Sequence, residues 1–346
     1  MTVLLSYITI QDWQLNKNKT NKSTINLLYF YAMCYTIKEN KRKVDYIIMF
    51  DQVQKHESSE GNVWKFVFIK EDAVTEAVLY KYDTFKDRTV ICCSVQSGCP
   101  VGCLFCGTGK KFIRNLTYGE IVYQVSQVID GMGIIEDVLS SKKFQIMFMS
   151  MGEPMLNWDN VELAIEILHD LYPNAQLLIS TVGINDDNTF RRMINISKKI
   201  NKVGLQFSIH KASDDERDVL IPFKNKMSLR RIRDAGLTWS KETGRPVYLN
   251  YCVDGNNVKE TDINRLKDLF SPIHFYFTFS VICSADETMK DAGYRNHETI
   301  LTVLKQFQEE GYNVRMFDPA GQDDIGGGCG QLFYVQQWLN EHNKLK

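Results

Sequence analysis

From Trp64 onward, short apolar runs typical of β-strands alternate with longer amphipathic stretches typical of α-helices. Strands separated by helices of this length predict βα units and a parallel sheet. Six or seven such units predict an α/β fold, a TIM-type barrel that is partial or complete, with its chemistry at the carboxyl ends of the strands. The expected strands are 90–95, 145–150, 176–181, 203–209, 247–253, 274–282 and 313–317, and the expected helices are 117–130, 158–171, 187–199, 228–243, 260–270 and 296–311.

The first 62 residues do not follow this pattern. Residues 1–48 carry Asn- and Lys-rich stretches around short apolar runs with no clear period, and 51–62 reads as a polar connection. Residues 64–69 and 77–82 then predict a short hairpin. We therefore expect an N-terminal appendage over residues 1–62 and a barrel domain with a small hairpin extension over residues 63–346. A functional chain that begins at Met49 is one explanation of the appendage.

Composition and charge narrow the class of protein. The 346 residues include 41 Lys and Arg against 42 Asp and Glu, and 44% are hydrophobic, which excludes disorder for most of the chain. A net charge of -1 excludes histone-like binding but not a local basic groove. The apolar run 25–37 is shorter than the ~20 residues of a membrane span. The start, MTVLLSYITIQDW, lacks the features of a signal peptide. We expect a cytoplasmic monomer with no membrane partner.

Five of the nine cysteines lie between Cys92 and Cys106, and their odd total argues against a disulfide framework. Cys99, Cys103 and Cys106 have CxxxCxxC spacing on one loop after a predicted strand. Three thiolates can hold three corners of a cubane iron–sulfur cluster and leave the fourth iron open to a small molecule. A zinc site is the alternative, but it needs a fourth Cys or His, and none lies nearby at CxxC-type spacing.

Four consecutive predicted strands end in polar or ligand-type residues. Cys99 follows the first strand, residues 152–154 the second, 180–181 the third and 208–210 the fourth. In a parallel barrel these ends meet at one mouth, so the sequence predicts an active site there. An ordinary strand-to-helix turn opened by Pro154 is the alternative for the second of these segments.

The CxxxCxxC loop, with Phe105 before its last cysteine, resembles the signature loop of the radical S-adenosylmethionine (SAM) superfamily. From about residue 64 to 334, the chain is similar to the RlmN/Cfr family of RNA adenine methyltransferases. The segments that carry this similarity are 92–109, 114–117, 149–154, 179–184, 207–210 and 323–332. The resemblance implies SAM, a one-electron reductant such as flavodoxin, and methylation of adenine C2 or C8 in rRNA, tRNA or both. It also implies a [4Fe–4S] cluster bound by Cys99, Cys103 and Cys106.

The resemblance also implies which residues contact SAM. Glu153 would bind the amino group of SAM, and Gly152 would let the backbone approach the ligand closely. Further SAM contacts carry over to Ser180, Ser208, Ile209 and His210. A buried, hydrogen-bonded histidine without a ligand is the alternative for the last of these.

Three residues are implied to carry the methyl transfer. Cys329, within a run of glycines that frees its backbone, would accept a methyl group from one SAM as a nucleophilic thiolate. Cys92 would help to resolve the protein–RNA adduct, and Glu76 would accept a proton. The neighbouring Cys93 is expected on the opposite face of its strand, as a buried thiol. An exposed thiol and an exposed hairpin carboxylate are the alternatives for Cys329 and Glu76.

Two departures from the family keep other functions open. Ser284 stands nearest to the Asn-Pro that the family uses for SAM, and the helical N-terminal domain is not recognisable in residues 1–48. The alternatives are a radical SAM enzyme acting on a peptide or small molecule, and an inactive relative. For RNA phosphates, the sequence offers basic residues near the cysteine loop, and others on predicted helices are expected to be solvated. The first group is Lys110, Lys111 and Arg114, and the second is Arg191, Arg192, Arg230, Arg231 and Arg233.

Overall fold

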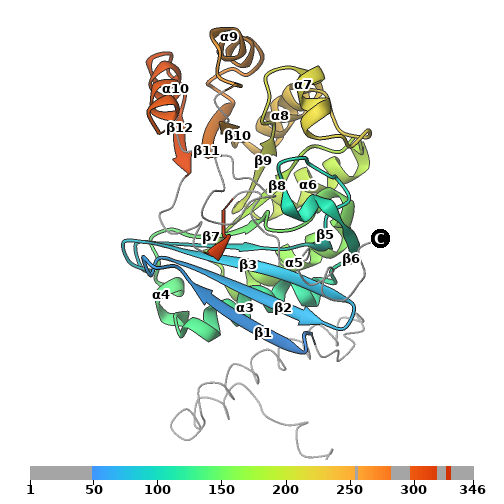
Figure 1. Cartoon of the computed structure of the whole chain (residues 1–346), viewed down its shortest axis with the longest axis vertical. Coiled ribbons are helices and arrows are strands. Elements are labelled where there is room, and N and C mark those ends of the chain that lie inside the picture. Colours follow the sequence, from blue (N-terminus) through green and yellow to red (C-terminus); the bar gives the residue numbers. More distant parts are fainter. Residues whose placement is uncertain (1–48, 254–255, 282–296, 318–324, 329–346) are drawn as a thin grey trace, which may run out of the picture. The chain divides into compact units, whose positions relative to one another are not determined.

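The computed structural model describes residues 49–253, 256–281, 297–317 and 325–328, which all lie in one compact unit, Met49–Lys346. Its centre is a ten-stranded sheet (Figure 1). The first four strands are antiparallel neighbours: β1 (Gln52–Glu57), β2 (Val63–Lys70), β3 (Ala73–Tyr82) and β4 (Arg88–Cys93). The strands that follow are parallel: β7 (Phe144–Phe148), β8 (Gln176–Thr181), β9 (Val203–Ser208), β10 (Val247–Val253), β11 (Phe275–Val281) and β12 (Val314–Phe317).

The predicted α/β fold with a large, mostly parallel sheet is confirmed. Strand β4 joins the two parts, because it pairs with β3 on one side and with β7 on the other. Strands β1 and β12 stand at the two edges, so no pairing within the described residues closes the sheet into a barrel. The carboxyl ends of β4 and β7 to β12 point to one side of the sheet, where the predicted site residues follow them.

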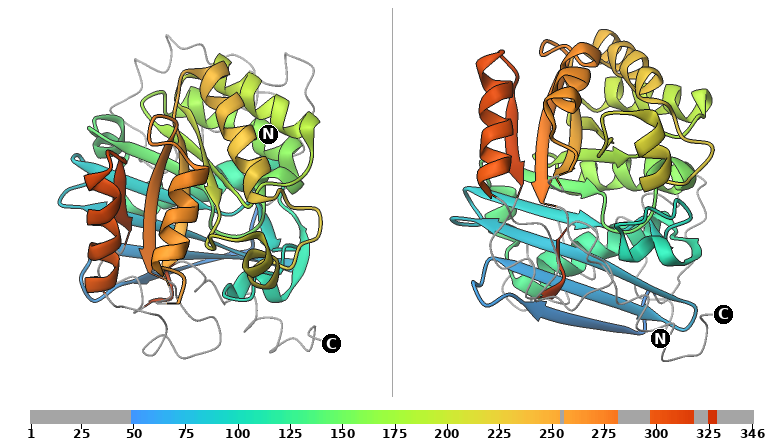
Figure 2. Two further views of the ribbon diagram at one scale, coloured as in Figure 1. Left: turned by 90° about the horizontal axis from the view of Figure 1, so that it is seen from above. Right: turned by 45° about the horizontal axis from the view of Figure 1, so that its top comes forward.

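Helices follow the parallel strands in chain order and pack as neighbours, α3 on α5, α5 on α6, α6 on α8, and α8 on α9. Figure 2 shows them as a layer along one face of the parallel strands. No helix in the described ranges is long and apolar enough to cross a bilayer. The helices are α3 (Tyr118–Met132), α4 (Ile135–Leu139), α5 (Trp158–Leu171), α6 (Asp187–Lys199), α7 (Asp214–Leu220), α8 (Leu229–Thr243), α9 (Glu260–Leu269) and α10 (His297–Glu309).

Capping residues explain why several helix boundaries lie where the sequence predicts them. Thr117 and Glu120 form a reciprocal capping box at the start of α3, and Gly133, with a φ of 66°, ends that helix. Asp186 caps α6 by accepting hydrogen bonds from the next backbone amides. Helices α5 and α6 match their predicted ranges, as do strands β8 and β10.

The N-terminal part of the sheet is larger than predicted. Residues 52–57, read from the sequence as part of a polar connection, form β1 and pair with β2. The prediction was wrong because β1 is an exposed edge strand whose polar residues hide the alternation of a half-buried strand. Strands β2 and β3 pair from Lys70↔Ala73 to Val63↔Tyr80, beyond the predicted hairpin ranges. A separate two-stranded sheet, β5 (Gln96–Gly98) with β6 (Phe112–Asn115), flanks the cysteine loop and was also not predicted.

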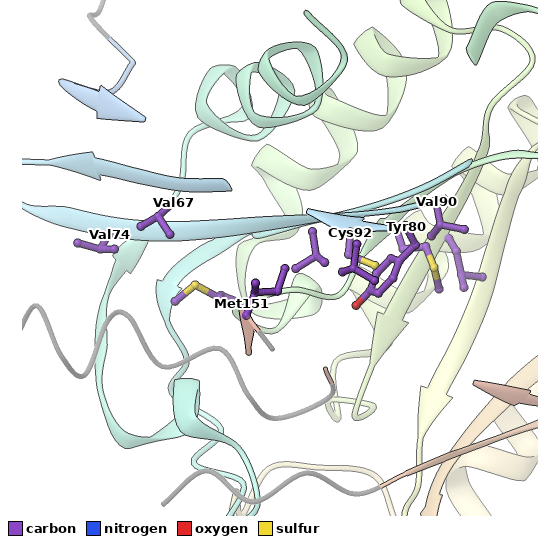
Figure 3. Packing of buried hydrophobic residues seen from close by; sticks show 11 residues of the cluster. Val67, Val74, Tyr80, Val90, Cys92 and Met151 are labelled. Atoms are coloured by element: carbon purple, nitrogen blue, oxygen red, sulfur yellow. The ribbon is translucent and has the colours of Figure 1, made fainter. Parts of the chain in front are cut away.

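One hydrophobic cluster fills the space on the inner face of β2, β3, β4, β7 and β8 (Figure 3). It includes Ile325, so residues 325–328 near the end of the chain pack against strands near its beginning. The other buried members are Val63, Val67, Val74, Val78, Tyr80, Val90, Cys92, Met147, Met151 and Leu178. The cluster therefore forms the floor beneath the site described next.

Candidate active site

A cavity lies at the carboxyl ends of the parallel strands and encloses about 1150 Å³, its open mouth included. The cavity brings together the cysteine loop, the ends of β4, β7, β8 and β9, and Gly327 and Gly328. These two residues belong to the run 326–328, which we call the glycine segment. Of the predicted site residues, it is lined by Cys92, Cys99, Cys103, Cys106, Gly152, Glu153, Ser180, Ser208 and His210.

The three loop cysteines share this cavity and are partly exposed. Backbone hydrogen bonds make the loop compact: the amide of Cys106 donates to the carbonyl of Cys103 at 3.1 Å, and that of Gly109 donates to the carbonyl of Cys106 at 3.1 Å. A Cβ on Gly109 would lie 3.0 Å from the nitrogen of Cys103, so a side chain there would crowd the loop. The short β5–β6 pair closes the loop at its base through a bond from the amide of Cys99 to the carbonyl of Lys111.

The electrostatics of these thiols fit a metal cluster. Burial raises the pKa of Cys99 and of Cys103, and the neighbouring cysteines and Glu153 raise both further. Three thiolates that repel each other in a buried site need a bound cation, and iron or zinc supplies that charge. No three His, Cys, Asp or Glu side chains in the described ranges converge on a single ion. A zinc ion needs four ligands on one atom, whereas the three thiolates of a cubane cluster each bind a different iron.

Glu153 is a buried carboxylate with neutral donors around it. Its Oε1 accepts hydrogen bonds from the hydroxyl of Thr181 at 2.6 Å and the amide of Met155 at 3.0 Å, and its Oε2 accepts one from the amide of Val182 at 2.9 Å. Burial raises the pKa of Glu153, and these hydrogen bonds oppose the rise. Within the described residues, no lysine or arginine forms an ion pair with it. The charge of Arg217 also lowers the pKa of Glu153, and the ammonium group of a ligand would add a direct partner.

Gly152 gives Glu153 its position. Its φ is 96°, and a Cβ there would lie 2.6 Å from the Cβ of Gln96. The amide of Glu153 donates to Oε1 of Gln96 at 2.9 Å, which ties the strand-to-helix turn to β5. The 3-10 helix η2 (Pro154–Asn157) follows directly, so Pro154 does open a helical turn as the alternative reading had it. The structure thus contains both the helical turn opened by Pro154 and a backbone at Gly152 that has no room for a side chain.

The other predicted SAM contacts divide into two groups. Ser180 lines the cavity, and its hydroxyl accepts a hydrogen bond from the side-chain Nε2 of Gln206 at 3.1 Å. Ser208 lines the cavity at the end of β9. Ile209 is fully buried and does not line the cavity. Its amide donates to the carbonyl of Asn250, so it packs behind its two neighbours.

His210 presents a neutral imidazole to the cavity. Its Nδ1 accepts a hydrogen bond from the amide of Cys252 at 3.1 Å, which places the proton on Nε2. Burial, followed by the charges of Arg217 and Lys211, lowers the pKa of His210 to about 3. Its φ of 58° lies in the left-handed region, which non-glycine residues seldom occupy. Its ring also meets Phe105 of the cysteine loop edge-on, with centroids 5.0 Å apart.

Arg217, on α7, is a fully buried guanidinium that binds backbone carbonyls around the site. It donates to the carbonyl of Met227 at 2.7 Å and to that of Val182 at 2.6 Å, and more weakly to that of Ser208 at 3.3 Å. Burial lowers the pKa of Arg217 to about 10, which leaves the group charged. Arg217 thus connects the ends of β8 and β9 from behind the cavity. The sequence analysis did not identify it.

The two neighbouring cysteines of β4 point to opposite faces, as expected. Cys92 lines the cavity. Cys93 is fully buried, its thiol lies 3.7 Å from the carbonyl of Met147, and burial raises its pKa. Cys93 is therefore a packing residue, and Cys92 is the member of the pair that a ligand can reach.

Glu76 lies fully buried on β3, so its interpretation as an exposed hairpin carboxylate is wrong. Its Oε2 lies 3.4 Å from Nζ of Lys65, whose side chain is also fully buried. The two residues are diagonal neighbours on one face of paired strands, because Val67 faces Glu76 and Lys65 faces Val78. Glu76 does not itself line the cavity.

Several polar residues of the cavity wall were missed by the sequence analysis. The amide of Gln206 is almost fully buried, and its Oε1 has no hydrogen-bond partner in the described part of the chain. The missed signal is a polar residue at every second position of an apolar strand, as in 275–281, where Thr278 and Ser280 alternate with phenylalanines. The missed lining residues that are polar are Thr108, Ser150, Gln206, Asn250, Thr278, Ser280 and Arg315.

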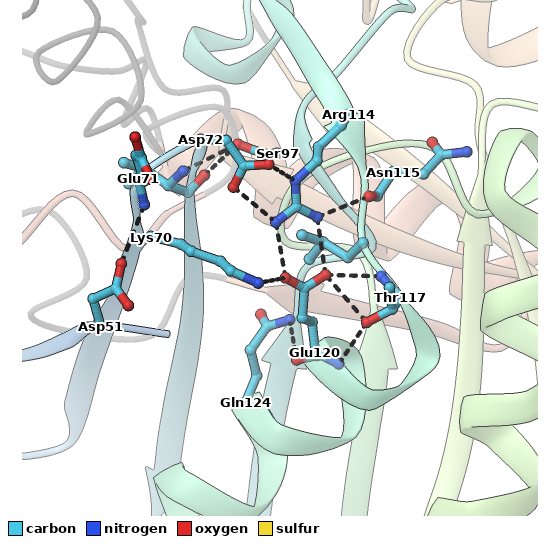
Figure 4. A network of polar contacts seen from close by, with 12 residues as sticks. Asp51, Lys70, Glu71, Asp72, Ser97, Arg114, Asn115, Thr117, Glu120 and Gln124 are labelled. Atoms are coloured by element: carbon cyan, nitrogen blue, oxygen red, sulfur yellow. Dashed lines mark hydrogen bonds and ion pairs between the residues drawn. The ribbon is translucent and has the colours of Figure 1, made fainter. Parts of the chain in front are cut away.

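Arg114, offered above as an RNA contact, is occupied by carboxylates (Figure 4). Its guanidinium donates two hydrogen bonds to Glu120, at 2.8 and 2.9 Å, and one from Nε to Asp72 at 2.9 Å. Lys70 adds an ion pair to Glu120 at 3.5 Å. This network ties β6 to α3 and to the β2–β3 turn, so Arg114 has a structural role. The predicted methyl-accepting Cys329 and the SAM contact Ser284 lie outside the described residues.

Comparisons with known proteins identify the family of this chain. The Radical SAM superfamily matches residues 93–270. Among curated proteins, a probable dual-specificity RNA methyltransferase RlmN of Thermotoga petrophila is 31% identical over 333 residues, 93% of this chain and 89% of that protein. One of the same name from Pseudothermotoga lettingae is 33% identical over 81% of this chain and 78% of its own length.

A solved structure resembles the fold over most of its length. It is that of a radical SAM methyltransferase from Sphaerobacter thermophilus, with a TM-score of 0.71, 26% identity, and coverage of 86% of this chain and 84% of the other. The chain belongs to the radical SAM superfamily and, within it, to the RlmN family of dual-specificity RNA methyltransferases.

Proposed function

We propose that this protein is a radical SAM methyltransferase that places a methyl group on an adenine carbon, C2 or C8, of rRNA, tRNA or both. One observation carries the proposal beyond family membership. The three loop cysteines, Glu153, Cys92 and the glycine segment before Cys329 line one cavity. A site that only cleaved SAM would need neither the thiol of Cys92 nor the glycine segment.

Radical SAM enzymes use a [4Fe–4S] cluster and SAM, and the donor set fits both. Cys99, Cys103 and Cys106 would hold the cluster, and the buried carboxylate of Glu153 would bind the ammonium group of SAM. When bound, the two cofactors supply the one-electron chemistry that an unreactive adenine carbon requires. The chain's own residues would orient the ligand: His210 could donate from Nε2–H, and the unpartnered Oε1 of Gln206 could accept.

Gly152, Ser180 and Ser208 would complete the SAM site, because all three line the cavity. Ile209 would support it indirectly by fixing the chain between Ser208 and His210. The parallel strands then correspond to a partial TIM-type barrel, and the barrel domain would begin near Met49, since β1 belongs to the sheet.

The covalent steps are assigned to Cys329 as methyl carrier, Cys92 as the thiol that resolves the protein–RNA adduct, and Glu76 as proton acceptor. Cys92 in the cavity wall and Gly328 beside it support the first two roles. The Lys65 partner of Glu76 supports an ionised carboxylate. A one-electron reductant such as flavodoxin, a monomeric state and a reducing, cytoplasmic location complete the proposal.

Cluster assignment is tested by anaerobic purification followed by iron and sulfide analysis. We expect one four-iron cluster in the wild type and none when Cys99, Cys103 and Cys106 are all changed to Ala. Four irons in that triple variant would refute the ligand set. Cys252→Ala is the control, since this cysteine is buried in β10 and does not line the cavity.

The methyl carrier is tested with labelled SAM and mass spectrometry. We expect a methyl group on the peptide holding Cys329, and covalent protein–RNA adducts in Cys92→Ala that are absent from Cys92→Ala/Cys329→Ala. Full activity of Cys329→Ala would defeat the mechanism. Nucleoside mass spectrometry of the RNA then decides between C2 and C8. Formation of 5′-deoxyadenosine without methylated RNA would favour a peptide or small-molecule substrate. Absence of both 5′-deoxyadenosine and methylated RNA would favour the inactive relative.

A further inference from the structure

Lys65, on β2, is a lysine whose side chain is fully buried. A buried ammonium group costs free energy unless charged and polar partners compensate it. Burial lowers the pKa of Lys65, and the charge of Glu76 and its hydrogen bond oppose this effect. The other partner of Nζ is the carbonyl oxygen of Gly326, at 3.4 Å. The ammonium group of Lys65 thus lies between a carboxylate of β3 and the backbone of the glycine segment.

Tyr80, on the adjacent strand β3, makes the next contact along that segment. Its hydroxyl donates to the carbonyl oxygen of Gly327 at 2.6 Å, which is short for an O–H···O hydrogen bond. Its ring meets Phe317 edge-on, with centroids 5.5 Å apart, and faces the inner side of the sheet in Figure 3. Two side chains from neighbouring strands therefore hold two consecutive carbonyl oxygens.

This segment has no side chains that could define its path, because residues 326–328 are all glycine. Gly326 has a φ of 59°, and Gly327 and Gly328 line the cavity without side chains to pack. Consecutive glycines lose more backbone entropy on ordering than other residues, so their position depends on outside contacts. Ile325 anchors the start of the segment in the hydrophobic cluster, and the two hydrogen bonds continue from that anchor.

We propose that Lys65 and Tyr80 are positioning residues that hold residues 326–328 in the cavity wall and so direct the chain into the site just before Cys329. This inference rests on the proposed function, because it concerns the delivery of the methyl-accepting thiol. Neither residue takes part in the chemistry. Both contact a backbone carbonyl of the segment, and Lys65 also pairs with Glu76, so together they fix the path of the chain before Cys329.

The test compares Tyr80→Phe with Tyr82→Phe in the full-length holoenzyme. Both changes remove one hydroxyl from β3, but Tyr82 does not line the cavity and its ring packs on the guanidinium of Arg88. We measure the single-turnover rate of Cys329 methylation with labelled SAM, and hydrogen exchange of the peptide that covers residues 325–328. Tyr80→Phe is expected to slow methylation about fivefold and to speed exchange, since one hydrogen bond is worth that factor. The affinity of Tyr80→Phe for SAM is expected to equal that of the wild type. Tyr82→Phe is expected to match the wild type in every assay.

Lys65 is tested without leaving a buried charge behind. Lys65→Met alone would leave the buried carboxylate of Glu76 without a positive partner. The protein would then lose stability for a reason unrelated to the contact with Gly326. The double variant Lys65→Met/Glu76→Gln removes both charges and keeps the volume of the pair. We expect it to fold and to methylate Cys329 more slowly than the wild type, because it lacks the contact to Gly326.

The outcomes separate this inference from the proposed function. The positioning role would be overturned if Tyr80→Phe, or the double variant, methylated Cys329 at the wild-type rate. A parallel loss of SAM affinity and thermal stability in Tyr80→Phe would also overturn it, since that pattern is a general loss of structure. Absence of methyl on Cys329 in active wild-type enzyme would instead overturn the proposed function.

Discussion

Gly152→Ala tests whether the turn before Glu153 tolerates any side chain. The φ of Gly152 is 96°, and an added Cβ would lie 2.6 Å from the Cβ of Gln96, closer than real Cβ atoms approach. Gln96 cannot yield easily, because its Oε1 accepts the amide of Glu153 and its Nε2 donates to Asn115 at 2.7 Å. Relief of the clash therefore requires a shift of backbone or the loss of a hydrogen bond.

The size of the effect follows from these contacts. A positive φ costs alanine about 1–2 kcal/mol. Overpacking costs about 1–3 kcal/mol, and the loss of one buried hydrogen bond adds about 1 kcal/mol. Gly152→Ala should then reduce the free energy of unfolding by about 3–6 kcal/mol. Gly133→Ala is the matched control, since Gly133 has a φ of 66° but an added Cβ would meet nothing within 4 Å. It should cost only the backbone term of about 1–2 kcal/mol.

Urea unfolding followed by circular dichroism, under anaerobic conditions, measures both free energies. A SAM-binding measurement on the folded fraction should show weaker binding for Gly152→Ala alone, because the clash displaces Glu153. Equal destabilisation by the two variants would refute the reasoning. It would mean that Gln96 moves freely and that close packing does not require glycine at position 152.

Three further outcomes are expected. The pKa of His210 is lowered to about 3 in the folded state. Below pH ~6.5 the unfolded chain binds a proton at this histidine and the folded protein does not. The free energy of unfolding therefore falls by about 1.4 kcal/mol for each pH unit below that value. His210→Asn, which suits a positive φ, should remove this slope between pH 7 and 5.5 in urea unfolding, and an unchanged slope would contradict the assignment. Arg217→Met should lower the melting temperature because it leaves buried carbonyls without a donor, and Arg217→Lys should rescue only part of the loss in a thermal scan. Cys93→Ala should retain RNA methylation while Cys92→Ala loses it, as measured by nucleoside mass spectrometry.

Much of the architecture could be predicted because local sequence and burial agree. Strands β8 and β10 are apolar runs of fixed length, and α5 and α6 combine an apolar stripe with a clear start, so all four have their predicted boundaries. The predicted cavity residues from the cysteine loop and from β7 to β9 also meet, because parallel strands bring their carboxyl ends to one side.

The remainder depends on pairing across the sheet, which local sequence does not reveal. An exposed hairpin carboxylate remained the alternative for Glu76, because its buried partner Lys65 becomes its diagonal neighbour only through the register of β2 and β3. Arg114 looked available for RNA because Asp72 and Glu120 approach it from two other elements. Arg217 reaches three carbonyls that are distant in sequence, so its role was invisible before the fold was known.

The contacts of Lys65 and Tyr80 join residues 261 and 247 positions apart in the chain. Contacts over such separations form late, whereas β1 to β4 pair with their nearest neighbours and can assemble while synthesis continues. A growing chain would therefore carry the Lys65–Glu76 pair long before the glycine segment that covers it exists. The cavity therefore gains its last wall only after residues 325–328 have been synthesised, long after the strands that they pack against.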